Sequence, residues 1–301
     1  MSETAGQSGT PESLRQRTWR RFLKAPDGKL VDDLYAPGLR IAWRYDRCCS
    51  YFSSTVLAAA ARGFGPFIQR VLDMGDRLPK PPIRLVVNEE LTAADLQALH
   101  ESGDTRPLEE LLLKRLRKPK ELLEKQRLGM LAWLAREGWL EVRVGVMRHG
   151  AGIVHAKFGL IRDSNGDAVV FSGSGNESAS GLVANYERLE VSSSWDDPER
   201  AEEYAQEFEQ LWTDTHPDVH IVPLPEAVRL KLIKIAPEEP PVTEPDLAVE
   251  RQRAAMLWRF ITEAPFFPDG DATCDETALV RMWPHQAKVI SDVAAAWPDG
   301  R

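Results

Sequence analysis

Residues 153–191 read IVHAKFGLIRDSNGDAVVFSGSGNESASGLVANYERLEV, and this stretch decides the fold and the candidate site. Apolar residues alternate with other residues from 153 to 161, which is the period of a β-strand. Such a strand would carry His155 and Lys157 on one face, about 7 Å apart. Its other face is apolar throughout, so we expect helices to cover it.

Turn and strand signals follow that first strand. DSNG at 163–166 is typical of a hairpin turn, and the runs 168–171 and 186–191 predict two further strands. Between these strands lies a Gly/Ser-rich loop, SGSGN at 172–176, in which backbone N–H groups and short side chains can approach an anion closely. Glu187 lies near the start of the last strand. One short stretch therefore supplies a histidine, a lysine, an anion-binding loop and a carboxylate.

Part of this stretch matches a known signature: His155-x-Lys157, Gly173-Ser174-x-Asn176 and Glu187. It resembles the active-site signature of the phospholipase D (PLD) superfamily, in particular its nuclease-type branch with one signature per chain. The resemblance covers roughly residues 30–235. The residues around the signature are most similar to PLD-like domains found ahead of bacterial DEAD/DEAH or Swi/Snf-type helicase modules.

One position departs from the family pattern. Arg162 stands where many members of the superfamily carry an aspartate, and Asp163 follows one residue later. Nuclease-type members often lack that aspartate. The departure therefore weighs against a lipid substrate rather than against hydrolysis.

The resemblance implies a mechanism without metal or cofactor. His155 would attack a phosphodiester phosphorus and form a phosphohistidine that water hydrolyses, while a second histidine protonates the leaving oxygen. Lys157, Asn176 and Ser174 would hold the non-bridging oxygens. Glu187 would orient the ring of His155. Because one chain offers one signature, we expect two chains to form a homodimer around a two-fold axis, with histidine facing histidine.

Composition limits the class of protein. The chain has 301 residues and a formal net charge of −8, which is not typical of a dedicated nucleic-acid binder. Two segments are nevertheless locally basic, 15–24 and 114–127, and they would guide a phosphate backbone if they flank the site. Three cysteines, no apolar signal core and no membrane-length apolar run indicate a cytoplasmic protein.

The order of elements predicts an α/β fold, with a mixed β-sheet sandwiched between helices. Expected strands include 39–43, 47–52, 83–88 and 140–146. Expected helices include 55–62, one that begins after Thr92, 108–137 with a break at Pro119, and 198–212. In the long helix, the residues expected to face the core are Leu122, Met130, Leu131 and Leu134.

Four parts are expected along the chain. They are a flexible N-terminal segment at 1–29, a PLD-like nuclease domain at 30–235, a Pro/Glu-rich linker at 236–248, and a final part at 249–301. That final part would hold a helical segment and the start of a truncated helicase domain. The prediction rests on RMWPHQ at 281–286, which resembles the stretch just before the nucleotide-binding loop of such helicases, although no such loop follows it here.

Three functions remain in competition. The leading hypothesis is a phosphodiesterase that cleaves DNA beside a helicase motor, in bacterial anti-phage defence. The defence role rests only on the proteins with which domains of this family occur. The alternative is a non-catalytic PLD-like module that binds DNA, dimerises and positions the motor. A phospholipase is disfavoured because the chain shows no amphipathic membrane stripe.

Other residues that often bind metals or react as nucleophiles have plainer interpretations. His216 and His220, in HPDVH, are interpreted as parts of a loop entering a strand, and His149 as a loop residue. Cys48 and Cys49 are adjacent, which does not fit a metal knuckle, so we expect free buried thiols.

Overall fold

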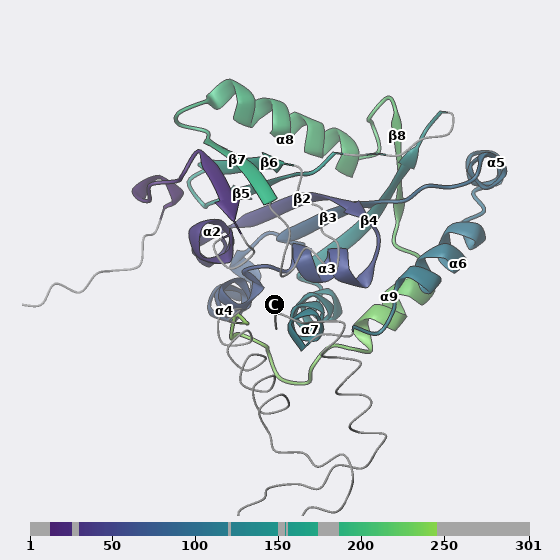
Figure 1. Ribbon diagram of the computed structural model, residues 1–301, viewed down its shortest axis with the longest axis horizontal. Coiled ribbons are helices and arrows are strands. Elements are labelled where there is room, and N and C mark those ends of the chain that lie inside the picture. The colour runs from purple at the N-terminus through teal and green to yellow at the C-terminus, as the bar shows by residue number, and fades with distance from the viewer. Residues whose placement is uncertain are drawn as a thin grey trace, which may run out of the picture. The chain divides into compact units, whose positions relative to one another are not determined.

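The computed structural model describes residues 13–25, 30–119, 122–149, 154, 156–173 and 187–245. The chain divides into two compact units, Met1–Pro245 and Asp246–Arg301, and all described residues belong to the first. These residues form an eight-stranded mixed sheet in the order β1-β7-β6-β5-β2-β3-β4-β8 (Figure 1). The predicted α/β fold is confirmed.

The strands are β1 (Phe22–Ala25), β2 (Arg44–Tyr51), β3 (Ile83–Asn88), β4 (Leu140–Met147), β5 (Phe158–Arg162), β6 (Ala168–Gly173), β7 (Glu187–Ser193) and β8 (Val219–Pro223). The central strands β2, β3 and β4 run parallel. The other neighbouring pairs are antiparallel. The start of β5 therefore lies at the same end of the sheet as the carboxyl ends of β2 and β3.

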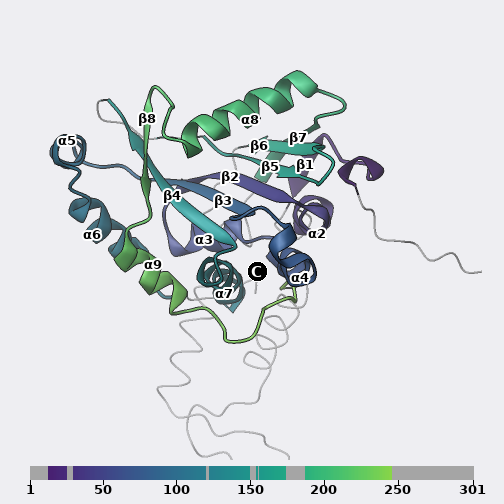
Figure 2. The same cartoon turned by 180° about the vertical axis from the view of Figure 1, so that it is seen from behind.

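Helices cover both faces of the sheet. They are α2 (Ala36–Ile41), α3 (Ser54–Ala60), α4 (Phe64–Met74), α5 (Ala93–Ser102), α6 (Arg106–Arg115), α7 (Leu122–Arg136), α8 (Pro198–Trp212) and α9 (Glu226–Ile233). Helix α8 lies over one face, and α2, α3, α4 and α7 lie over the other (Figures 1 and 2). None of the described helices is long and apolar enough to cross a membrane.

Two hydrophobic clusters hold these layers together. On the α8 side, Phe158 and Leu160 of β5 pack with Phe208 and Trp212 of α8. On the other side a larger cluster joins the sheet to the remaining helices, and Ile161 of β5 belongs to it. The alternation seen in the sequence from 158 to 161 therefore reflects two covered faces.

The predicted strand at 39–43 is wrong, because this segment lies mostly in α2. Short apolar runs fit a strand or a buried helix equally well. Pro37 lies in the first turn of α2, where its fixed φ suits a helix. Leu39 and Ile41 are buried. The helix approaches the sheet closely at Gly38, where a Cβ would lie 2.7 Å from Ile161 Cδ1.

Other bounds differ in smaller ways. The strand predicted over 153–161 begins only at Phe158, so Lys157 lies just before it, and His155 lies outside the described residues. Leu122 was expected in the core but is 49% exposed, because it is the first residue of α7 and its neighbour Leu123 turns inward. Strand β3 and helix α8 have the predicted bounds.

Part of the segment expected to be flexible, 1–29, is instead built into the sheet. Strand β1 pairs antiparallel with β7. Just before it, the backbone N–H of Leu14 and the hydroxyl of Ser13 both donate to the carboxylate of Asp163, at 2.9 and 3.1 Å. This buried carboxylate anchors residues 13–25 to the hairpin turn after β5.

Residues 236–245, expected to be linker, pack against the helical layer. The carboxylate of Glu244 accepts hydrogen bonds from the backbone N–H groups of Gly63 and Gly65, each 3.0 Å long, at the start of α4. A carboxylate is stabilising at a helix N-terminus, where N–H groups lack helical partners. Arg136 of α7 also donates to a backbone carbonyl of this segment.

A buried ion pair joins β2 to both of its neighbours in the sheet, β3 and β5. Asp46 of β2 is fully buried, and Arg84 of β3 donates to both of its oxygens at 2.6 and 2.9 Å. Arg162 of β5 pairs with the same carboxylate. Arg84 also reaches Glu209 of α8, with Nη2 2.5 Å from Oε1, and this hydrogen bond lowers the pKa of Glu209.

We predict that Glu209→Gln makes stability less sensitive to acid. The pKa of Glu209 is lowered in the folded protein, so its contribution is present above the unfolded-state pKa and is lost as the pH falls through the folded-state pKa. The free energy of unfolding, from urea titrations between neutral pH and about pH 3, should differ most from wild type near neutrality. The effect should be modest because the side chain is 48% exposed. A difference that stays constant with pH would contradict this.

We predict that Gly159→Ala destabilises the protein by about 1–3 kcal/mol. A Cβ at Gly159 would overlap the ring of Phe171, with Cε1 only 2.9 Å away, and that ring is buried and stacked on Tyr45. The matched control is Gly129→Ala in α7, where the Cβ would meet Pro237 Cδ at an ordinary 3.6 Å. Urea denaturation should show a loss only for the first variant. Equal stability of both variants would show that the Phe171 ring moves freely.

Candidate active site

The strand pairing brings Lys157 and the start of the Gly/Ser loop together. Lys157 comes directly before β5, and its carbonyl accepts a hydrogen bond from the backbone N–H of Gly173 at 3.3 Å. Gly173 ends β6 and pairs with Leu189 of β7. Glu187 begins β7 two residues earlier. Lys157, Gly173 and the backbone of Glu187 therefore lie at one end of the sheet.

Three of the predicted catalytic residues lie outside the described part of the chain: His155, Ser174 and Asn176. Glu187 is described as a strand residue through its backbone. The structure does describe the residues next to them in the sequence: Ala156 and Lys157 follow His155, and Ser172 and Gly173 precede Ser174. The proximity of the histidine, the loop and the glutamate side chain stays a prediction.

The structure gives a steric reason for the glycine that opens the Gly-Ser-x-Asn pattern. A Cβ at Gly173 would overlap the backbone carbonyl oxygen of Arg188 and come within 2.9 Å of Leu189 Cδ2. Strand β7 thus passes too close for any other residue. A glycine at this position often marks a close approach between two backbones.

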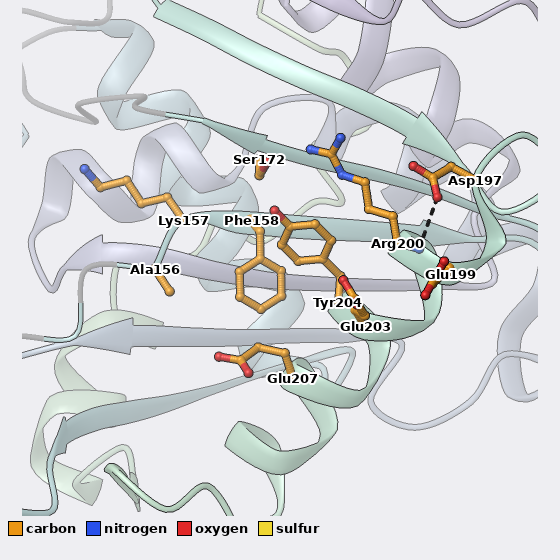
Figure 3. A pocket seen from close by; sticks show the side chains of 10 residues that line it. All are labelled: Ala156, Lys157, Phe158, Ser172, Asp197, Glu199, Arg200, Glu203, Tyr204 and Glu207. Atoms are coloured by element: carbon orange, nitrogen blue, oxygen red, sulfur yellow. Dashed lines mark hydrogen bonds between the residues drawn. The ribbon is translucent and has the colours of Figure 1, made fainter.

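A cavity of about 680 Å³ opens beside Lys157 on the α8 face of the sheet. The sheet side of its wall is Ala156, Lys157, Phe158 and Ser172, and the α8 side is Asp197, Glu199, Arg200, Glu203, Tyr204 and Glu207. Figure 3 shows the Lys157 side chain extending away from Asp197, Glu199 and Arg200. Four carboxylates on this wall would repel a phosphodiester. The cavity is therefore a poor channel for nucleic acid, although Lys157 borders it.

A second polar group, which the sequence reasoning missed, lies at the carboxyl ends of β2 and β3. Tyr51 ends β2 and pairs with Asn88, the last residue of β3. Glu89 follows, with a fully buried side chain whose two oxygens meet Arg115 of α6, at 2.9 Å to Nε and 3.0 Å to Nη2. Burial raises the pKa of Glu89, and Arg115 works against that rise. The sequence held one signal for this group: two glutamates, Glu89 and Glu90, directly follow the buried strand IRLVVN.

Arg162, which replaces the aspartate of the PLD pattern, and the following Asp163 both have structural roles. Arg162 pairs with the buried Asp46, as described above. Asp163 is buried, and its carboxylate also accepts from the backbone N–H groups of Asn165 and Asp167, at 2.9 and 3.1 Å. Both side chains are thus engaged in holding β5 and its turn.

Two further histidines and two cysteines of the described part of the chain lie in structural surroundings. His220 lies in β8, with Nδ1 3.1 Å from Asp214 Oδ2, and His216 lies in the loop before it, with Nε2 3.5 Å from Glu207 Oε1. The prediction of a loop entering a strand is confirmed. Cys48 and Cys49 are both buried, as expected.

Comparison with known proteins adds one sequence match. Residues 83–212 match the sequence model of the family described as "Cardiolipin synthase, PLD-like domain", which spans all five predicted site residues but less than half of the chain. This segment is therefore similar to a PLD-like domain. No curated protein gives a significant match.

Among solved structures, NucT from Helicobacter pylori is similar over 63% of this chain and 96% of its own, at 15% identity and a TM-score of 0.33. A likeness this distant does not bear on the activity of the present chain.

We predict that Gly173→Ala loosens the candidate site without disturbing the centre of the sheet. The added methyl would overlap the Arg188 carbonyl oxygen and push β6 and β7 apart. This happens at the residue whose N–H donates to the Lys157 carbonyl. Hydrogen exchange should accelerate in the backbone amides of 187–191, while β3 and β4 keep their protection. Gly129→Ala is again the control. Unchanged exchange in β7 would mean that the two strands accept a side chain there.

Proposed function

We propose that this chain is a metal-independent phosphodiesterase that cleaves DNA through a phosphohistidine on His155. The observation that carries the proposal is the hydrogen bond between Gly173 and Lys157, which joins the two halves of the signature at one end of the sheet. The match of residues 83–212 to a PLD-like domain supports the same chemistry.

The proposed reaction has two steps. In the first, a ring nitrogen of His155 forms a bond to phosphorus while the bond from phosphorus to the leaving oxygen breaks, and a second histidine gives that oxygen a proton. In the second, water attacks the phosphorus, the phosphorus–nitrogen bond breaks, and the second histidine takes the proton of the water. Lys157, Ser174 and Asn176 would stabilise the negative charge on the non-bridging oxygens in both steps. Glu187 would hold the ring of His155 in the required tautomer.

The second histidine is proposed to come from a second copy of this chain. A two-fold axis near Lys157 would bring the two His155 side chains to opposite sides of one phosphodiester. The wider proposal places this nuclease beside a helicase motor, with residues 249–301 leading into that motor, and in bacterial anti-phage defence. That part rests on the sequence resemblance alone.

The first test is DNA cleavage in excess EDTA. Single- and double-stranded DNA are incubated with wild type, His155→Ala and Lys157→Ala, and the oligomeric state of each is measured by light scattering. Wild type should cleave, His155→Ala should show no cleavage, and Lys157→Ala should lose about 100- to 1,000-fold in rate because one donor to the developing charge is gone. His155→Ala should still dimerise.

The matched control is Lys80→Ala, which removes an exposed lysine just before β3, at the opposite end of the sheet. This variant should cleave like wild type. Cleavage that requires a divalent metal, or that survives in His155→Ala, would refute the proposal. Tight DNA binding by a dimer that never cleaves would favour the non-catalytic module.

A further inference from the structure

We propose that residues 114–118 form a docking surface for the DNA strand next to the scissile phosphodiester. This surface, the basic rim, consists of Lys114, Arg115, Arg117 and Lys118. The inference rests on the proposed function and specifies how the substrate is held. It means that the chain is built for a polyanionic strand and not only for a single phosphodiester group.

The side chains of the basic rim are exposed, and its backbone is held by contacts with the core and with α3. All four cationic residues are exposed to solvent, whereas Leu116 between them is buried. Ser54, the first residue of α3, donates to the backbone carbonyl of Arg117 at 2.5 Å. The backbone of the rim therefore has a defined position where the chain leaves α6. Its charged side chains point away from the core.

Arg115 is held by an unusual partner for an exposed cation. Its side chain is 41% exposed, yet the Glu89 carboxylate that holds it is fully buried: Oε1 accepts a hydrogen bond from Nη2 at 3.0 Å, and Oε2 forms an ion pair with Nε at 2.9 Å without a hydrogen bond. A buried carboxylate is costly unless it is well paired, so this contact fixes the guanidinium in place. A fixed guanidinium loses less entropy when it binds a phosphate, and its planar fork suits phosphate oxygens.

The rim lies at the same end of the sheet as Lys157. The guanidinium of Arg115 lies 5.8 Å from the ring centre of Tyr51, the last residue of β2. Strand β5 pairs with β2 through Phe158 and Cys48, and the thiol of Cys48 donates to the carbonyl of Ala156 at 3.4 Å. With strand rise and spacing of about 3.3 and 4.8 Å, Lys157 and Tyr51 have Cα atoms within roughly 10 Å of each other.

Charge at a helix end alone does not explain the rim. Basic residues are favourable in the last turn of a helix, which would account for Lys114 and Arg115. Arg117 and Lys118 come after α6 has ended, so the helix dipole gives no reason for them. Carboxylates lie beside the rim as well: Glu89 pairs with Arg115, and Lys114 and Arg115 line a cavity whose wall also holds Glu90, Asp95, Asp104 and Glu110. Arg117 and Lys118 are not part of that wall. Four exposed cations nevertheless lie within the five residues 114–118. This concentration of positive charge is notable in a chain whose net charge is −8.

The test compares two substrates for one set of variants. The rim variant Lys114→Gln/Arg117→Gln/Lys118→Gln leaves the contact between Arg115 and Glu89 intact. We expect about a 10-fold higher KM for a DNA oligonucleotide, because phosphate contacts are lost, with kcat little changed. Hydrolysis of bis(4-nitrophenyl) phosphate, which is too small to reach the rim, should stay within about twofold of wild type.

Salt dependence supplies a readout that needs no catalysis. The slope of log Kd for DNA against log salt concentration should fall by about 2 to 3, because each lost phosphate contact removes about 0.7 to 0.9. The charge-matched control replaces three cations elsewhere with glutamine: Arg77, Lys80 and Arg229. It should keep the wild-type slope. Arg115→Gln combined with Glu89→Gln, which removes the buried charge together with its partner, should lower the slope by a further contact.

The outcomes separate this inference from the proposed function. Loss of DNA affinity in the rim variant, with no cleavage of either substrate by wild type, would support the rim and refute the nuclease. Normal cleavage with unchanged KM and slope in the rim variant would overturn the rim and leave the nuclease standing. An equal effect in the charge-matched control, or no DNA binding by wild type, would also overturn the rim.

Discussion

The buried carboxylate of Asp46 fixes the register of β2 against both of its neighbours, β3 and β5. It faces Arg84 on β3 and Arg162 on β5, so it binds both neighbours of β2 at once. A slip of one residue would turn Asp46 to the other face of the sheet and leave buried charges without partners, which costs far more than a lost contact on the surface. Because the register is fixed at this point, the ends of β2, β3 and β5 are aligned as well. The positions of Lys157 and Tyr51 follow from that alignment.

Charged residues are unevenly distributed around the sheet. Carboxylates gather on α8 over one face, beside the cavity that Lys157 borders, while four exposed cations lie at 114–118, next to a cavity that also holds Glu90, Asp95, Asp104 and Glu110. This distribution would reconcile an acidic chain with the proposed DNA substrate, because the carboxylates of α8 would repel a strand that the cations at 114–118 attract. Net charge alone pointed away from nucleic acid, since it averages over surfaces that differ in sign.

Much of the fold follows from local patterns in the sequence. Strand β3 is a continuous apolar run, and α8 begins with Asp197 and Pro198, so both have the predicted bounds. The segment 39–43 was misjudged because a short apolar run does not distinguish strand from buried helix. The anchoring of 13–25 by Asp163, and the pairing of Glu89 with Arg115, join residues far apart in the chain, and no local pattern encodes them. At the candidate site, the family resemblance implied that Lys157 and the Gly/Ser loop act on one phosphate. Strand pairing places Lys157 beside Gly173, and the positions of His155, Ser174 and Asn176 stay a prediction.

The Glu244 contact has a consequence for where the polypeptide can be cut. The family match ends at residue 212, yet two backbone N–H groups at the start of α4 depend on a carboxylate that comes after α9. A polypeptide trimmed to the recognisable domain would leave those N–H groups without their partner and uncover the packed surfaces of α4 and α7. The smallest piece that folds as this structure does therefore extends to about Pro245.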